Sequence, residues 1–152
     1  MNFELKIPPV LVTLITILIA YVLAKAIPIT IIDILYNDVV AGCFIFLGFV
    51  LILNSLFIFK YHETTANPLK PETSSTLVTT GTYKLSRNPI YLGLLLIVLG
   101  MIIYYKALSS IIIIPIFIWY MTQYQIIHEE NAMKSLFGSE YENYYQRVRR
   151  WL

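Results

Sequence analysis

The chain has 152 residues, of which 58% are hydrophobic and 13% are charged, and its mean hydropathy is +0.71. Soluble domains usually carry about 25% charged residues, so this composition predicts an integral membrane protein built as one domain, residues 1–152. The net charge of +2 is too small to indicate a nucleic-acid partner. A single cysteine, Cys43, excludes an intramolecular disulfide, and its apolar neighbours predict a buried position.

Two apolar runs predict the first two membrane-spanning helices. The first covers about residues 7–27, and we interpret it as a span because no small-residue cleavage site of a signal peptide follows it. The second covers about residues 39–59. In this run Gly42 and Gly48 predict close packing against a neighbouring helix, and Asn54 predicts an interhelical hydrogen bond.

The longest polar region is Lys60–Asn88, which contains Pro68 and Pro71 and a middle part rich in Thr and Ser. A segment of this length without a helix is uncommon in a compact domain unless it forms a binding or lid element. We therefore expect a folded loop on the cytoplasmic side, and a plain linker is the alternative.

This loop ends in a sequence that predicts the start of a helix at a membrane boundary. Asn88 is a favourable N-cap, and Pro89 suits the first helical position because its φ is fixed and its N–H is missing. An almost wholly apolar run of about residues 90–105 follows and predicts a third span. The free N–H groups and the positive dipole end of this helix favour an anionic ligand.

A fourth apolar run covers about residues 108–127 and is separated from the third only by Lys106-Ala107. So short a connection predicts a tight antiparallel hairpin of the third and fourth spans. Gly93 and Gly100 lie two turns apart and predict a face that another helix approaches closely. Pro115 predicts a bend in the fourth span, with a gap beside it.

The C-terminal segment is more polar and predicts interfacial amphipathic helices. Gly138 stands where a helix would stop, and Tyr141, Tyr144 and Val148 recur at helical intervals after it. We expect the tyrosines to face the membrane and the arginines to face lipid headgroups. These arginines are Arg147, Arg149 and Arg150.

The distribution of positive residues predicts the orientation. Lys and Arg are concentrated in the Lys60–Asn88 loop and the C-terminal segment, whereas the opposite connections hold only Lys25 and Lys106. With four spans, the positive-inside rule places the loop and both termini in the cytoplasm, and we expect a prokaryotic cytoplasmic membrane.

The predicted hairpin brings the helix start at Asn88-Pro89 close to Glu129 and Glu130, at the end of the fourth span. Arg87 and the free N–H groups suit a carboxylate, the glutamates suit an ammonium, and nearby aromatic rings suit a base or a sulfonium. S-adenosylmethionine carries all of these groups. The chain lacks Gly-x-Gly-x-x-Gly, so binding by a doubly wound nucleotide fold is excluded.

Several motifs occur in order in the second part of the chain. They are Gly81-Thr82-Tyr83, Arg87-Asn88-Pro89, Tyr91-Leu92-Gly93, Glu129-Glu130, Phe137-Gly138, Tyr141, Tyr144 and Arg149-Arg150-Trp151-Leu152. This order resembles the isoprenylcysteine carboxyl methyltransferase family and its phospholipid methyltransferase relatives over about residues 64–152. The resemblance implies that this part binds S-adenosylmethionine at the cytoplasmic rim and that a lipidic substrate reaches it sideways from the bilayer.

The resemblance also implies site residues, since the family's motifs fall on Arg87, Asn88, Pro89, Tyr91, Glu129 and Glu130. The chemistry of the residues themselves adds the Tyr83 ring and the Ile90 N–H group. We expect catalytic roles for Arg87, Glu129 and Glu130, and the expected cofactor-binding residues are Tyr83, Arg87, Asn88, Pro89, Ile90, Tyr91, Glu129 and Glu130. Two positions depart from the pattern, since Asn88 stands where many members have histidine and Thr82 where many have proline. Asparagine takes no proton near neutral pH, so a base would come from His62, His128 or a glutamate, and two histidines alone do not make a metal site.

The methyl acceptor stays open among an isoprenylcysteine-like carboxylate, a phospholipid amine, a small thiol and a quinone-like lipid. A carboxylate is already ionised, whereas an amine or thiol must lose a proton. Two other functions are compatible with the motifs: an NADPH-dependent reductase of the sterol reductase type and a non-catalytic lipid-binding scaffold. Leu94 argues against the reductase, which typically has an acidic residue at that position. Membrane lipids are the expected partners, and the oligomeric state is left open.

Overall fold

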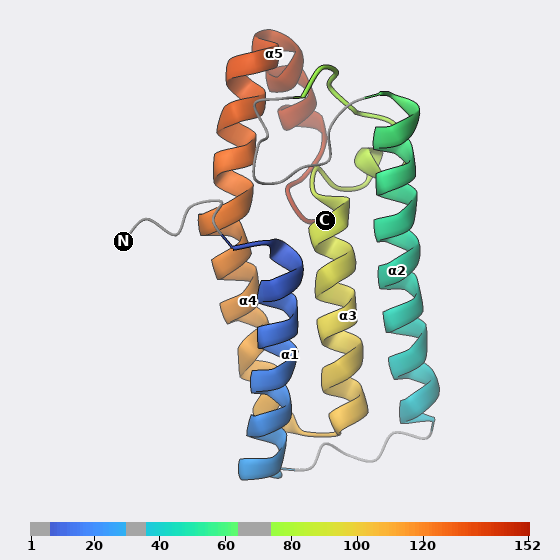
Figure 1. Ribbon diagram of the computed structural model, residues 1–152, viewed down its shortest axis with the longest axis vertical. Helices are drawn as coiled ribbons and strands as arrows, with labels where there is room; N and C mark the ends of the chain where they lie inside the picture. The colour runs from blue at the N-terminus through green and yellow to red at the C-terminus, as the bar shows by residue number, and fades with distance from the viewer. Residues whose placement is uncertain (1–6, 30–35, 64–73) are drawn as a thin grey trace.

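The computed structural model describes residues 7–29, 36–63 and 74–152, and within these residues the chain is helical without a β-strand. The main helices are α1 (Pro9–Ala26), α2 (Asn37–Tyr61), α3 (Pro89–Tyr105), α4 (Ile113–Met121) and α5 (Ile127–Arg147). Between them lie the 3₁₀ helices η2 (Gly81–Lys84) and η3 (Leu108–Ile112) and the π-helical turn η4 (Thr122–Ile126). The prediction of an all-α fold is confirmed. Figure 1 shows α4 and α5 as one long rod beside α1, α2 and α3.

Within the described residues, three segments are long and apolar enough to cross a membrane: Pro9–Ala26, Asn37–Tyr61 and the rod Leu108–Arg147. The helix α3 is apolar but shorter, with 17 residues. All four predicted runs therefore fold as helices, while the four-span topology stays a prediction. Large apolar side chains point outward from α1 and α2, as lipid-facing residues do, and Leu18 and Phe46 are examples. Cys43 is exposed as well, so the prediction of a buried cysteine is wrong, because α2 presents much of its surface outward.

Glycines allow α2 and α3 to pack closely, and α3 makes its most extensive contact with α2. A Cβ atom at Gly93 would lie 2.7 Å from the Gly48 carbonyl oxygen, and one at Gly100 would lie 2.8 Å from the Ala41 carbonyl oxygen. The close packing predicted for Gly48, Gly93 and Gly100 is confirmed. The prediction for Gly42 is wrong, because nothing lies within 4 Å of a Cβ atom placed there.

The link between α3 and the rod is short, as expected. α3 ends at Tyr105, Lys106 adopts a left-handed conformation with φ 55°, and η3 begins at Leu108. Yet α3 contacts α1 more than it contacts α4, and α1 also packs on the rod, where Ser110 Oγ donates to the Ala20 carbonyl oxygen at 2.7 Å. The helix α1 therefore packs against both α3 and the rod that follows it.

The prediction of an interhelical hydrogen bond from Asn54 is wrong, whereas the bend at Pro115 stays a prediction. Asn54 is exposed, and it is the adjacent, buried Ser55 that bonds across elements, to Thr82 Oγ1 at 3.1 Å. Pro115 lies in the first turn of α4, where its missing N–H costs little, and it does not line the main cavity described below. The backbone of the rod departs from α-helical geometry at the 3₁₀ helix η3 before Pro115, at the π-helical turn η4 and at Gly138.

The chain reverses at Gly138, whose φ of 49° and ψ of −120° interrupt α5 as the sequence predicts. The last segment then folds back, and the C-terminus lies beside the start of α3 (Figure 1). Tyr141 and Tyr144 are each only 4% exposed. The prediction that they face the membrane is wrong, because the reversal turns this segment over the end of the bundle.

Candidate functional site

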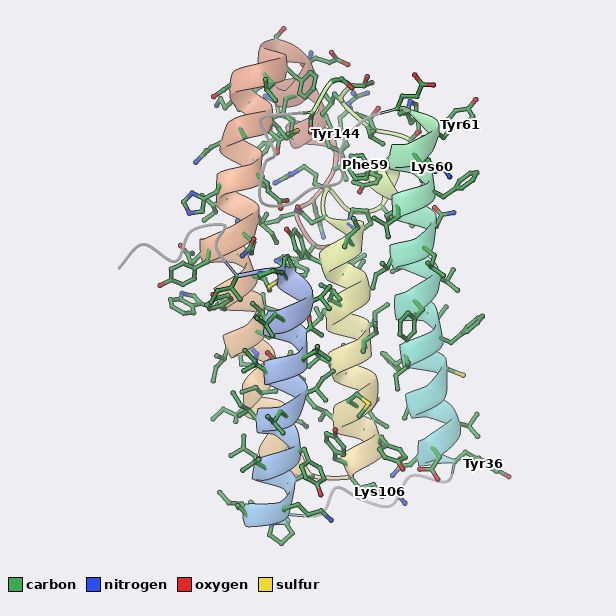
Figure 2. The ribbon with its side chains drawn as sticks, in the orientation of Figure 1. Tyr36, Phe59, Lys60, Tyr61, Lys106 and Tyr144 are labelled. Atoms are coloured by element: carbon green, nitrogen blue, oxygen red, sulfur yellow. The ribbon has the colours of Figure 1, made fainter. Side chains whose placement is uncertain are left out.

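A cavity of about 570 Å³ opens at the end of the bundle where α2 ends and α3 begins. Its volume is typical of small-molecule sites, which span about 300–1,000 Å³. Residues from α1, α2, η2, α3 and α5 line it, together with residues 74 and 76–78. Figure 2 shows two lining residues from distant parts of the chain, Phe59 and Tyr144, at this same end, while Lys106 and Tyr36 lie at the other.

All of the site residues expected from the sequence line this one cavity. They are Tyr83, Arg87, Asn88, Pro89, Ile90, Tyr91, Glu129 and Glu130. The two histidines behave differently, since neither lines it. His62 lies at the end of α2 with its ring nitrogen 3.2 Å from Thr80 Oγ1, so it does not replace the missing histidine at Asn88. Among the described residues, no group of His, Cys, Asp and Glu has the arrangement of a metal site.

The start of α3 presents unfilled backbone donors to the cavity. Pro89 occupies the first turn, and Asn88 stands at the N-cap position, as expected. The Asn88 side chain does not cap the helix, however, and instead donates its Nδ2–H to the Arg150 carbonyl oxygen at 3.0 Å. The first N–H groups of a helix have no partner within it. Among the described residues, the N–H groups of Ile90 and Tyr91 have no acceptor, so a ligand or water can accept from them.

Arg87 is buried and its guanidinium is already engaged. Its Nε and Nη2 donate to Glu130 Oε1 at 3.3 and 2.7 Å, and its Nη1 donates to the carbonyl oxygens of Tyr145 and Val148. The group also lies 4.0 Å from the centre of the Tyr145 ring, a cation–π distance. Arg87 thus joins the loop before α3 to α5 and to the segment after it.

Glu130 lies between two arginines. Its Oε2 accepts from Arg150 Nη2 at 2.6 Å, and its Oε1 accepts from Arg150 Nε at 3.1 Å as well as from Arg87. The Glu130 side chain is 10% exposed. The hydrogen bonds that Arg150 donates to Glu130 raise the pKa of the Arg150 guanidinium above its ordinary value. Glu130 is therefore held in an ion-pair cluster and has little capacity left for a ligand.

Glu129 has a different environment although it is the next residue. Its Oε1 accepts a short hydrogen bond from the Tyr91 hydroxyl, and no arginine or lysine of the described residues pairs with it. The side chain is half-buried and lines the cavity. Of the two glutamates, Glu129 is thus the carboxylate that a cationic or hydroxyl group of a ligand can reach.

Tyrosines close the cavity on the side of η2 and α5. The Tyr83 ring packs edge to face on the Phe59 ring, with 5.3 Å between the ring centres. The backbone carbonyl oxygen of Tyr83 accepts from the Tyr144 hydroxyl at 2.7 Å. Burial raises the pKa of the Tyr83 hydroxyl well above its ordinary value, so this group stays neutral. Tyr141 and Tyr144 line the same cavity. The rings form an apolar wall with polar tips, which suits a nucleoside.

Some lining residues were not expected from the sequence. The apolar part of the cavity comes from α1 and α2, through residues such as Leu14, Phe49 and Leu53, and these helices carry no motif. The hydrogen bonds of the C-terminal segment to Ser86 and Asn88 were not expected either. A sequence signal existed only for Tyr141 and Tyr144, whose helical spacing marked one face but not the direction in which it points.

The family model for phospholipid methyltransferase matches residues 36–140, which is more than half of the chain. The chain belongs to this family. The family match and the apolar helices together support a membrane methyltransferase. The match covers the start of α3 and both glutamates. No solved structure matches the chain.

Similar proteins occur in bacteria and plants. An uncharacterized protein of Haemophilus influenzae is 43% identical over 63 residues, which are 41% of this chain and the whole of that protein. Protein-S-isoprenylcysteine O-methyltransferase B of Arabidopsis thaliana is 32% identical over 80 residues, and a probable protein-S-isoprenylcysteine O-methyltransferase of Oryza sativa is 33% identical over 72 residues. These matches cover 53% and 47% of this chain but only 41% and 38% of the plant proteins.

Proposed function

We propose that this chain transfers a methyl group from S-adenosylmethionine to a lipidic or amphiphilic acceptor at the cytoplasmic face of a membrane. The observation that carries the proposal is the single cavity that joins the start of α3 to Glu129. The cofactor-binding part is residues 64–152 of one domain; of these, 64–73 lie outside the described residues.

The residues around the cavity fit the cofactor group by group. The N–H groups of Ile90 and Tyr91 at the positive end of α3 suit its carboxylate. Glu129 suits its ammonium or a ribose hydroxyl, and the rings of Tyr83 and Tyr91 suit the adenosine and the sulfonium. S-adenosylmethionine supplies an electrophilic methyl group on that sulfonium.

Arg87 and Glu130 have a different proposed role from the direct contacts that the sequence suggests. Their side chains bind each other, so Arg87 contributes its positive charge and shape to the site while Glu130 aligns it. Asn88 and Pro89 set the direction of the first turn of α3. These residues keep the groups that hold the cofactor in place before it binds, which limits the reorganisation that binding requires.

We further propose that the acceptor occupies the apolar part of the cavity. Leu14 on α1 and Leu53 on α2 both line it and are also 58% and 63% exposed on the outside of the bundle. The hydrocarbon part of an acceptor in the bilayer can therefore reach the cavity between these two helices. An amine or thiol acceptor must lose a proton, and Glu129 is placed to receive it, whereas a carboxylate acceptor needs no base.

The orientation proposed for the membrane follows from charge. The end of the bundle with the cavity carries Lys60, Lys84, Lys134 and Arg147, whereas Lys25 and Lys106 lie at the other end. The positive-inside rule then assigns the cavity to the cytoplasm, where S-adenosylmethionine is made and used.

Transfer of labelled methyl groups tests this function. Membranes that contain the chain are incubated with methyl-labelled S-adenosylmethionine, and the lipid extract is analysed by mass spectrometry. We expect labelled amphiphiles that are absent from membranes without the chain. Oxidation of added NADPH without methyl transfer would instead support the reductase, and absence of both reactions would support the scaffold.

A further inference from the structure

The residues after α5, Val148–Leu152, fold back across the start of α3, and we call them the C-terminal strap. We propose that Arg150 in this strap is a positioning residue of the cofactor site: it holds Glu130 by its side chain and the Ser86–Asn88 segment by its carbonyl oxygen. The inference rests on the proposed function, because it names a further residue on which cofactor binding depends.

The strap is fixed to the loop before α3 by backbone groups. The Arg150 carbonyl oxygen accepts from Ser86 Oγ at 3.1 Å and from Asn88 Nδ2 at 3.0 Å. One residue earlier, the Arg149 carbonyl oxygen accepts the backbone N–H of Arg87 at 2.9 Å. Ser86 is fully buried, and its hydroxyl also accepts the backbone N–H of Asn88 at 3.1 Å. The strap thus sets the path of the chain immediately before Pro89.

The other contacts of the strap fix it to the rod. Arg150 makes two hydrogen bonds to Glu130, one to each carboxylate oxygen, and Trp151 Nε1 donates to Thr122 Oγ1 at 3.3 Å. Arg150 does not itself line the cavity, although Glu130 does. Its effect on a ligand must therefore pass through the residues that it holds.

Arg150 consequently links the two sides of the proposed cofactor site. One side is the start of α3, with the free N–H groups of Ile90 and Tyr91, and the other is the pair Glu129-Glu130 on α5. Without the Arg150 guanidinium, Glu130 keeps only Arg87 as a partner, and the strap loses its side-chain hydrogen bonds to Glu130. The Arg87–Glu130 and Tyr91–Glu129 bonds still join the two sides, but Glu130 and the segment before α3 are held less firmly, which weakens ligand binding even though no ligand contact is removed.

Binding of S-adenosylhomocysteine to the purified full chain in nanodiscs, measured by isothermal titration calorimetry, tests the proposal. We expect Arg150→Gln to weaken binding about tenfold or more, as loss of a charged hydrogen-bonding group does, and Arg150→Lys to restore part of it. Arg147→Gln is the matched control, because Arg147 is exposed and its Nε bonds within its own helix, to the Asn143 carbonyl oxygen. It should bind as the wild type does.

A second variant covers the case in which Arg150→Gln does not fold. Ser86→Ala removes one anchor of the strap and adds no bulk, and it should weaken binding by about threefold to tenfold with helicity unchanged. Wild-type affinity in Arg150→Gln, or in Ser86→Ala where Arg150→Gln is unfolded, overturns the role of Arg150 while the proposed function stands. Absence of binding in the wild type overturns both.

Discussion

The guanidinium Nη2 of Arg87 lies 2.7 Å from Glu130 Oε1, although the two residues are 43 positions apart in the chain. Their side chains are only 7% and 10% exposed. Because Glu130 is already paired with Arg87 in a buried ion pair, we propose that the two adjacent glutamates have different roles: Glu130 supports the structure of the site, and Glu129 is the carboxylate that faces a ligand.

The first prediction concerns the stability of this scaffold. Glu130→Gln leaves the Arg87 charge buried without its partner, which should lower the free energy of unfolding by about 3 kcal/mol. Glu129→Gln removes no ion pair of the described residues and keeps an acceptor for Tyr91, so its stability should stay within about 1 kcal/mol of the wild type. Unfolding by SDS in mixed micelles, followed by circular dichroism, measures both. Equal loss of stability in the two variants would contradict the division of roles.

A second prediction concerns Tyr91, whose hydroxyl donates to Glu129. Tyr91→Phe leaves the ring in place but frees the Glu129 carboxylate to turn, so we expect S-adenosylhomocysteine to bind about tenfold more weakly. Tyr104→Phe is the control, because Tyr104 is exposed near the other end of α3. Calorimetric titration compares the variants, and unchanged affinity in Tyr91→Phe would argue that Glu129 needs no orientation.

The third prediction tests helix packing. Gly93→Ala places a Cβ atom 2.7 Å from the Gly48 carbonyl oxygen, so α2 and α3 must separate, and the free energy of unfolding should fall by about 1–3 kcal/mol. Gly42→Ala on α2 meets nothing within 4 Å and should be neutral or stabilising by up to about 1 kcal/mol through helix propensity. The same SDS titration applies. Similar effects of the two substitutions would show that α2 and α3 do not approach as described.

A fourth prediction separates the acceptor from the cofactor. Leu53→Trp narrows the apolar part of the cavity and should reduce methyl transfer to an amphiphile about tenfold or more while S-adenosylhomocysteine still binds. Leu47→Trp is the control, because Leu47 is exposed on α2 and does not line the cavity. Transfer rates and calorimetry are measured on the same preparations. If Leu53→Trp lost S-adenosylhomocysteine binding as well as methyl transfer, the apolar part of the cavity would not be a separate acceptor site.

Much of this architecture could be predicted because membrane helices have a strong local signal. Apolar runs of sufficient length gave the helices, and Asn88-Pro89 gave the start of α3, since capping and proline geometry depend on neighbouring residues alone. The close approach at Gly93 followed from the same reasoning, because small residues such as glycine let two helix backbones approach closely.

Other features depended on long-range contacts that local patterns do not encode. The spacing of Tyr141 and Tyr144 identified a face of a helix, but the reversal at Gly138 decided that this face turns inward. Arg150 was expected to meet lipid headgroups, and it instead pairs with Glu130, 20 positions away. The different roles proposed for Glu129 and Glu130 likewise depend on Arg87 and Arg150, which pair with Glu130 and not with Glu129. Two glutamates that are adjacent in the sequence give no sign of this difference.

Cross-linking to the bound cofactor tests the central claim most directly. Purified chain is irradiated with radiolabelled S-adenosylmethionine, and the labelled peptides are mapped by mass spectrometry. We predict label within Tyr83–Tyr91 or Glu129–Tyr144, abolished by excess S-adenosylhomocysteine and strongly reduced in Glu129→Gln. Label confined to segments that do not line the cavity, or label that S-adenosylhomocysteine fails to displace, would contradict a cofactor site between the start of α3 and Glu129.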